Sequence, residues 1–362
     1  MNNMKKKVII LYNKLFHYRL PIFNLLAQKY DLTVVYSYPA KEEDIAQCQF
    51  KTIYVPIKKV GSLFFHKQSI KGLCKEADAV IAYGQITYVD YMKLAFSRRN
   101  YKLLFWSIGA PASYGRHYGE ASSIHYAIED FFSKRADALI FYSEKAKEMH
   151  IGRGFDKDML FVANNTVEVE KVDLTPNLKQ NLLFIGTLYL EKGLQDLLEA
   201  YKAANEISPN VPVLKMIGGG QQLSIVKDWI KKHGLSNKIE LLGPIYDPQK
   251  KAELFKHALA CISPKQAGLS VLESMGYGVP FVTEKNAITG GEAFNIQSGV
   301  NGIMMENLSE LKDVILDISN NREKYLLMGE KAYEHYWNYR TPENMSRGVE
   351  DAIEYVLAKR NL

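Results

Sequence analysis

The sequence predicts an α/β protein built from two Rossmann-like domains, each a doubly wound parallel sheet with helices on both faces. Short apolar runs alternate with helical patterns over residues 8–163, and the same alternation begins again at residue 182. The segment between them, Glu168–Gln180, is polar and contains Pro176, as is typical of a linker. Apolar strands that alternate with helices form parallel sheets whose faces are both covered.

The elements of the first half follow in chain order. Strand-like runs occur at Val8–Tyr12, Leu32–Tyr36, Thr52–Val55, Ala79–Tyr83, Leu103–Ser107, Ala138–Tyr142 and Leu160–Ala163. Helical patterns lie at Leu20–Lys29, Tyr88–Ser97 and Ile124–Arg135. The loop after the first strand, Asn13–Arg19, lacks a G-x-G-x-x-G pattern, which argues against a dinucleotide-dependent dehydrogenase.

The second half repeats the same order of elements. Strands are predicted at Leu182–Ile185, Pro212–Ile217, Ile239–Leu242, Ala258–Ile262 and Phe281–Thr283, and helices at Gly193–Ala204, Leu223–His233, Lys250–Lys256, Leu269–Tyr277 and Met345–Leu357. We expect a first domain at residues 1–172 and a second at 173–339, with a helix at about 340–362 that packs back onto the first. Ligands of paired Rossmann-like domains bind at the carboxyl ends of the strands, so we expect the domains to face a central cleft.

The composition is that of a globular enzyme of the cytoplasm. The 362 residues are 47% hydrophobic and 24% charged, and the three cysteines are widely spaced without a C-x-x-C pair. No apolar run reaches the length of a membrane span, and the apolar start of the chain is too short for a signal peptide. Because the cysteines are few and lack a C-x-x-C pair, we expect neither a disulfide framework nor a zinc site.

Positive charge is concentrated in the first half of the chain. Residues 1–180 hold 26 Lys and Arg against 18 Asp and Glu, a balance of +8, whereas the remainder holds 20 against 22. The block Lys51–Lys75 contains no acid, and within it residues 62–73 are expected to form a short amphipathic helix. Such a helix is typical of a segment that binds an anionic membrane surface. The alternative is a solvated helix whose apolar side packs on its own domain. Nucleic acid is not expected as a partner, because no recognition motif accompanies the charge.

The segment Ala258–Pro280 contains the most informative pattern. A buried strand is followed by a loop with Gly268, and a helix then begins near Leu269 and ends at Gly278-Val279-Pro280. Free N–H groups at such a helix N-terminus hold phosphate. Glu273 lies about one turn into the helix, where its carboxylate can bind a ribose diol. The pattern therefore favours a nucleotide-sugar.

The same segment resembles the signature of glycosyltransferase family 4, retaining enzymes with the two-domain GT-B fold. That signature has two glutamates eight positions apart around a G-x-G-L loop, followed by L-E-A-M-A-x-G-x-P. Gly268-Leu269, Leu272-Glu273, Met275 and Gly278-Val279-Pro280 match it, whereas the first glutamate falls on Lys265. The resemblance implies that Gly268, Leu269 and Glu273 bind the donor.

A second matching segment is Leu183–Gly193, which is similar to the family pattern F-x-G-R-L-x-x-E-K-G. Gly186, Lys192 and Gly193 are in place, and the arginine is replaced by Thr187. In the family the arginine and the lysine hold the donor diphosphate, which implies donor-binding and catalytic roles for Lys192. A lysine at a helix N-terminus opposes the helix dipole, and an anionic ligand would explain it. The resemblance also implies that Gly186, Thr187 and Lys265 bind the donor. Lys265 is a catalytic candidate that supplies the cation that Thr187 lacks, and the alternative is that it points to solvent.

Further matches extend the resemblance over residues 136–338. The Gly218-Gly219-Gly220 turn lies where the family has a G-x-G turn beside the nucleotide, which implies that Gly218 and Gly219 bind the donor. Residues 290–292 and 297–302 are similar to its G-G-x-x-E and D-G-x-N-G segments, and residues 141–144 and 162–166 to its V-S-E and P-N-T segments.

The first domain offers candidates for sugar and acceptor contacts. The loop Trp106–His117 lies where the family often places a histidine that faces the donor sugar, so His117 is a candidate catalytic residue. Arg19 and Arg116 are candidates for an anionic group of the acceptor, with simple surface placement as the alternative.

The expected function is a retaining, metal-independent glycosyltransferase of polysaccharide or glycoconjugate synthesis, peripheral on the inner face of the cell membrane. The donor is a nucleotide-diphosphate sugar acting as co-substrate, no cofactor is expected, and the acceptor is a glycan or lipid-linked glycan. No paired carboxylates or H-x-x-x-D cluster points to a hydrolase or a metal-dependent transferase. A GT-B nucleotide-sugar epimerase and a non-catalytic GT-B scaffold are the alternatives.

Overall fold

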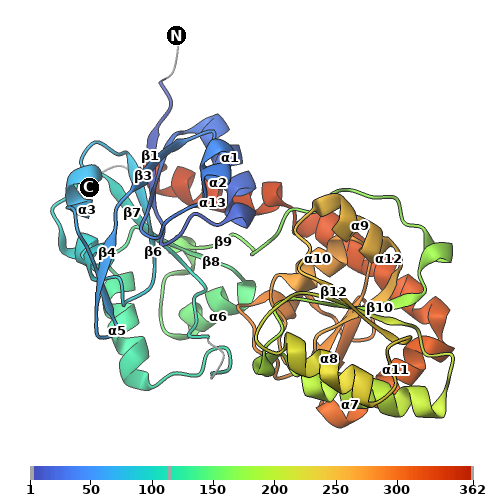
Figure 1. Cartoon of the computed structure of the whole chain (residues 1–362). Coiled ribbons are helices and arrows are strands. Elements are labelled where there is room, and N and C mark those ends of the chain that lie inside the picture. The colour runs from blue at the N-terminus through green and yellow to red at the C-terminus, as the bar shows by residue number, and fades with distance from the viewer. Residues whose placement is uncertain (1–3, 113–115, 360–362) are drawn as a thin grey trace. The chain divides into compact units, whose positions relative to one another are not determined.

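The computed structural model describes residues 4–112 and 116–359. The chain divides into two compact units. The first comprises Met1–Pro111, Gly119–Thr166 and Pro342–Leu362, and the second Ala112–Tyr118 and Val167–Thr341. Each unit contains a parallel sheet with helices on both faces, so the α/β prediction of two Rossmann-like domains is confirmed (Figure 1).

The sheet of the first unit has the strand order β3-β2-β1-β6-β7-β8-β9, and all its pairs are parallel. Its strands are β1 (Lys7–Leu11), β2 (Asp31–Tyr36), β3 (Lys51–Tyr54), β6 (Ala79–Tyr83), β7 (Lys102–Ser107), β8 (Ala138–Phe141) and β9 (Leu160–Val162). Its helices are α1 (Leu20–Lys29), α2 (Glu42–Ala46), α3 (Ile70–Leu73), α4 (Val89–Lys93), α5 (Ser123–Ser133) and α6 (Glu144–Gly152).

The sheet of the second unit has the order β12-β11-β10-β13-β14-β15 and is also parallel throughout. Its strands are β10 (Asn181–Ile185), β11 (Leu214–Ile217), β12 (Ile239–Gly243), β13 (Ala258–Ile262), β14 (Phe281–Glu284) and β15 (Gly302–Met305). Its helices are α7 (Leu194–Ile207), α8 (Leu223–Lys232), α9 (Pro248–Lys256), α10 (Ser270–Gly276), α11 (Leu311–Asn320) and α12 (Arg322–Tyr339).

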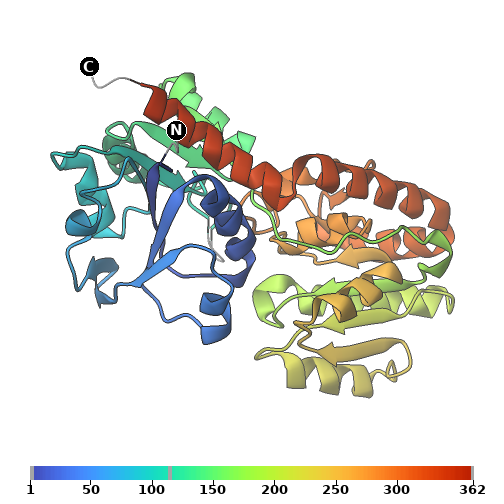
Figure 2. The same ribbon diagram turned by 90° about the horizontal axis from the view of Figure 1, so that it is seen from above.

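The last helix, α13 (Pro342–Ala358), belongs to the first unit although it follows the second in the chain. It packs on α1, β8 and β9, and Figure 2 shows it lying along that unit. Met345, Val349 and Ile353 are fully buried in the same core cluster as Phe23 of α1. Among the described residues, no helix has the length and apolar character needed to cross a bilayer.

The prediction of an amphipathic helix over residues 62–73 is wrong. Residues Ile57–Val60 (β4) and Leu63–His66 (β5) instead form an antiparallel hairpin, and only Ile70–Leu73 is helical. Gly61 and Ser62 form the two-residue turn, and Gly61 has φ of +60°, the conformation that tight hairpin turns need and that glycine adopts without strain. The lysines Lys58 and Lys59 therefore lie on an exposed strand next to the hairpin turn.

We predict that Ile353→Ala lowers the free energy of unfolding by about 2–5 kcal/mol, because it leaves a cavity where α13 meets the first sheet. The measurement is urea denaturation. Ile151→Ala is the control, since Ile151 is in the same unit but 45% exposed, and its effect should stay within about 0.5 kcal/mol. Equal effects of the two substitutions would contradict the placement of α13 in this core.

Candidate functional site

The second sheet contains a switch point at β10. From β10 the sheet extends through β11 to β12 on one side, and through β13 and β14 to β15 on the other. The carboxyl ends of β10 and β13 therefore lie next to each other, because the two strands are paired in parallel. Ligands of open α/β sheets bind at such a point. The loops at 186–193 and 263–269, which contain most of the expected donor residues, follow these two strands.

Lys192 is a buried cation for which the described residues provide no counter-ion. It ends a short 3-10 turn, Leu190–Lys192, and is 7% exposed. Its ammonium lies against Gly186 at the end of β10, 6.0 Å from the ring centroid of Phe184 and 5.7 Å from that of Tyr189. Across the described parts of the chain no carboxylate forms an ion pair with it. Burial lowers the pKa of Lys192 to about 8.

Packing requires two of the three glycines after β11, whereas a Cβ on Gly219 would make only an ordinary contact, 3.6 Å from Pro244. A Cβ on Gly218 would overlap the carbonyl oxygen of Gly186, and one on Gly220 would lie 2.6 Å from that of Leu188. The N–H of Leu188 donates to the carbonyl of Gly219 at 2.9 Å, and that of Gln222 to the carbonyl of Leu188 at 3.1 Å. The loops after β10 and β11 are thus joined backbone to backbone.

At Gly268, in contrast, packing does not require a glycine. A Cβ built on it meets no atom within 4 Å, and its φ is not positive. In the described chain, the amides of Gly268, Leu269 and Ser270 have no recorded acceptor, whereas Val271 N–H donates back to the Gly268 carbonyl. The backbone therefore offers donors next to open space, where a ligand could approach closely.

Glu273 lies in the first turn of α10 and is 9% exposed. Its Oε1 accepts a hydrogen bond from the ammonium of Lys251 in α9, a partner that the sequence analysis did not identify. One carboxylate oxygen of Glu273 is therefore engaged within the protein, and Oε2 has no recorded partner in the described chain.

Lys265 also has a partner that the sequence did not reveal. Its ammonium lies 2.7 Å from Oδ2 of Asp196, an acid in the first turn of α7. Its stem passes over Gly193, where a Cβ would lie 3.0 Å from Lys265 Cγ. Glu284 at the end of β14 is also near: burial raises its pKa, and Lys265 opposes that rise. Unlike Lys192, Lys265 thus has two carboxylates beside it.

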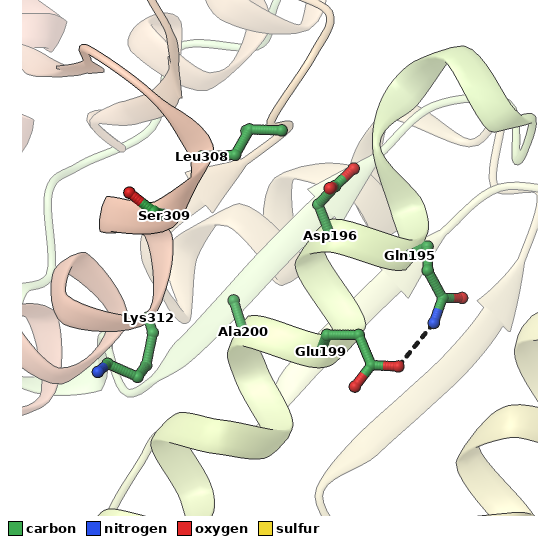
Figure 3. A pocket seen from close by; sticks show the side chains of 7 residues that line it. All are labelled: Gln195, Asp196, Glu199, Ala200, Leu308, Ser309 and Lys312. Carbon is green, nitrogen blue, oxygen red and sulfur yellow. Dashed lines mark hydrogen bonds between the residues drawn. The ribbon is translucent and has the colours of Figure 1, made fainter.

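Asp196 also lines a pocket of about 370 Å³ between α7 and the start of α11 (Figure 3). The other lining residues are Gln195, Glu199, Ala200, Leu308, Ser309 and Lys312. Gln195 donates to Glu199 at 2.7 Å, the bond drawn in Figure 3. Two carboxylates against one lysine would repel a diphosphate, so we do not place the donor in this pocket.

Arg19 follows β1 of the first sheet and is 2% exposed. Its guanidinium donates to Asn165 Oδ1 at 2.6 Å and to Tyr12 Oη at 3.4 Å, and lies 4.9 Å from the ring centroid of Tyr142. No carboxylate of the described residues pairs with it. This burial gives Arg19 a role in holding the strand ends of its own unit together.

The remaining candidates, Arg116 and His117, are exposed and are grouped with the second unit. The electrostatic effect of His117 lowers the pKa of Glu284, which burial raises, so the His117 ring lies in the neighbourhood of the Lys265 cluster. Residues 113–115 of the same loop lie outside the described residues. Thr187 is exposed beside Gly186. No group of three potential metal ligands occurs among the residues described.

Sequence reasoning missed three charged residues of this site: Asp196, Lys251 and Glu284. Asp196 carries a local signal, because an acid in the first turn of a helix complements the helix dipole. No local sequence signal identifies Lys251 or Glu284, because their positions depend on how α9 and β14 pack.

Comparison with known proteins finds that the second unit is similar to glycosyltransferases. Residues 168–335 match the family model described as glycosyl transferases group 1. An uncharacterized glycosyltransferase of Haemophilus influenzae is 24% identical over 208 residues, which are 54% of this chain and 55% of that protein. The chain therefore spans about half the length of this relative.

Solved structures share the fold over nearly the whole chain. A glycosyltransferase from Rickettsia africae has a TM-score of 0.74 at 14% identity, covering 98% of this chain and 100% of that one. Anabaena Alr3699/HepE, solved in complex with UDP-glucose, has a TM-score of 0.70 at 17% identity and covers 96% and 99%. The predicted GT-B type of fold, with two Rossmann-like domains, is thus confirmed.

We predict that Gly218→Ala and Gly268→Ala differ in stability. The first substitution forces a Cβ into the Gly186 carbonyl at φ of +148°, and should cost about 1–3 kcal/mol. The second meets open space and should stay within about 0.5 kcal/mol of the wild type. Urea denaturation of both variants tests this, and a large loss for Gly268→Ala would show that Gly268 is needed for packing.

Proposed function

We propose that this protein is a retaining glycosyltransferase that moves a sugar from a nucleotide-diphosphate sugar to a glycan or lipid-linked acceptor. The observation that carries the proposal is Lys192: a cation 7% exposed, without a counter-ion among the described residues, at the switch point of the second sheet. A buried charge that lacks a partner is costly, and the diphosphate of a donor would supply that partner.

Three further features support a nucleotide-sugar as the ligand. The backbone N–H groups of Gly268 and Leu269 are without recorded acceptors within the described chain, and space is open in front of Gly268. Glu273 has one carboxylate oxygen free of recorded bonds there, which suits a ribose hydroxyl. UDP is the first nucleotide to test, because the similar Anabaena protein was solved in complex with UDP-glucose.

The chemistry in this proposal is mainly charge stabilisation. The bond from the anomeric carbon to the diphosphate breaks, the acceptor oxygen bonds to that carbon on the same face, and the acceptor proton passes to the leaving phosphate. Lys192, with the amides of the 263–269 loop, would stabilise the charge that develops on that phosphate. His117 is proposed beside the sugar, with no metal ion and no cofactor required.

The acceptor and its setting are proposed from charge. Arg116 is exposed and is the better candidate for an anionic acceptor group, because the guanidinium of Arg19 is already occupied by Asn165 and Tyr12. An acceptor carried on lipid would place the enzyme at the inner face of the cell membrane, in polysaccharide or glycoconjugate synthesis. The excess of positive charge in residues 1–180 fits an anionic surface there.

We predict that UDP affinity falls as the pH rises through about 8. In the free protein Lys192 is protonated below this pKa and neutral above it, and only the protonated form attracts the diphosphate. Binding raises the pKa in the complex, so the dissociation constant should increase by up to about tenfold per pH unit above pH 8. Titration calorimetry from about pH 7.5 to about pH 8.8 measures it, since the diphosphate is almost fully ionised and the uracil ring is still largely neutral there.

The variant Lys192→Met should bind UDP about 10–150-fold more weakly at pH 7 and lose the pH dependence, because one charge-assisted hydrogen bond is worth about 1.5–3 kcal/mol. Its stability should be equal or higher, since a buried charge is removed. Lys312→Met is the matched control and should bind normally. If Lys312→Met loses binding and Lys192→Met does not, the donor occupies the pocket of Figure 3 instead.

We predict that Asp196 competes with the donor for Lys265. Asp196→Asn removes the carboxylate from its 2.7 Å ion pair, so UDP affinity should rise by about two- to fivefold, and Lys265→Met should lower it by a similar factor. In the double variant, Asp196→Asn should have no further effect. Additive effects of the two substitutions in this double-mutant cycle would exclude Lys265 as a phosphate ligand.

A further inference from the structure

Helix α5 of the first unit has an apolar face that is largely exposed. Ile124, Ile128 and Phe131 are spaced so that they form one stripe along the helix, and they are 71%, 45% and 50% exposed. Phe96, 52% exposed, extends the stripe, with its ring 5.4 Å from that of Phe131. No residue of α5 is fully buried. Isolated exposed apolar residues are ordinary, but a contiguous set marks an interaction surface.

The opposite side of α5 holds the helix on its unit. Arg153 donates from Nε to Asp130 at 3.0 Å, and its Nη2 lies 3.8 Å from a carboxylate oxygen of Glu129. The guanidinium also lies 4.7 Å from the ring centroid of Tyr126. The two acids of α5 are thus turned toward Arg153, so neither contributes negative charge to the exposed stripe. The helix is anchored along one side while the apolar stripe stays largely exposed.

Arg135 partly covers the stripe, and two further exposed cations lie close to it in the sequence. Arg135 lies 4.0 Å from the ring centroid of Phe131 and 4.7 Å from that of Phe96, so its charge rests on the apolar surface itself. Arg98 is exposed two residues after Phe96, and Lys134 is exposed one residue before Arg135, with its ammonium 5.6 Å from the ring centroid of Phe155. None of these three cations has an ion-pair partner in the part of the chain that the structure describes. The surface therefore combines apolar side chains with uncompensated positive charge.

The combination of apolar side chains and positive charge favours one of two possible occupants of this surface. A second copy of the chain paired through a two-fold axis would bring the same patch onto itself, so that the cations of both copies would share one interface without an added counter-charge. An anionic bilayer would receive the apolar side chains at the level of its headgroups and neutralise all three cations. We propose that the α5 face, defined by Phe96, Ile124, Ile128, Phe131 and Arg135, docks on an anionic lipid surface. The proposal deepens the proposed function, because it gives a lipid-linked acceptor a defined side of the first unit.

The test is sedimentation of the full chain with vesicles of phosphatidylglycerol or of phosphatidylcholine. We expect binding to the anionic vesicles only, weakened by salt. Ile124→Ser with Ile128→Ser should lower the partition coefficient at least about tenfold, and Arg98→Ala with Lys134→Ala about fivefold per charge. Since these side chains are exposed, the variants should keep the thermal stability of the wild type.

Matched controls define the surface. Ile207→Ser with Ile225→Ser removes exposed isoleucines from the second unit and should leave vesicle binding unchanged. Lys58→Ala with Lys59→Ala tests the β4–β5 hairpin, and loss of binding there, with normal binding of the α5 variants, would overturn the proposal. Equal sedimentation with both lipids would also overturn it, as would a wild-type dimer in light scattering that the α5 variants convert to a monomer. UDP binding, measured separately on the same variants, should be normal; its absence from the wild type would count against the glycosyltransferase alone.

Discussion

The position of β10 between β11 and β13 is the constraint on which the candidate donor site depends. Alternate residues of this strand enter two different cores: Leu182 and Phe184 pack in one cluster, Leu183 and Ile185 in the other. The strand is therefore held on both faces, and the backbone that leaves it at Gly186 has a fixed origin. Because β13 is the parallel neighbour of β10, the loop with Lys265 and Gly268 begins beside that point.

Burial of a cation alone does not mark a ligand site in this protein. Burial lowers the pKa of Lys179 to about 8, as it does for Lys192. The ammonium of Lys179, however, donates to the carbonyls of Ala258 and Phe255 at 3.2 and 3.5 Å. Arg19 is likewise buried and has Asn165 as an acceptor. The distinguishing property of Lys192 is therefore the lack of a recorded acceptor among the described residues, which leaves its charge available to an anion.

The sequence predicted the features that depend on local pattern. The alternation of apolar runs and helices was sufficient for both sheets, and the run Ala258–Ile262 followed by Gly268 was sufficient for the transition from β13 to α10. Strand β5 was mistaken for the start of a helix over residues 62–73, because a short apolar run fits the period of a helix as well as that of a strand. Strand β15 was not predicted from the sequence, because it has only four residues and the loop before it contains no strong apolar run.

The ion pairs of the site could not be predicted in the same way. Lys265 meets Asp196, and Glu273 meets Lys251, only after separate elements have packed together. A single sequence shows which charges are present but not which of them neutralise each other. Motif resemblance placed Lys265 and Glu273 in the site and gave no information on the residues already bonded to them.

The return of α13 to the first unit has a consequence for synthesis on the ribosome. The core of the first unit includes Met345, Val349, Ile353 and Val356, so it cannot be completed until the segment 342–358 has emerged. All strands of the second unit lie within residues 167–341 and therefore emerge earlier. During synthesis the N-terminal domain of a protein usually folds first. In this protein the core of the second unit can be completed before the core of the first. During that interval the apolar face of β8, β9 and α1 is exposed, and this is when chaperone binding would protect the nascent chain.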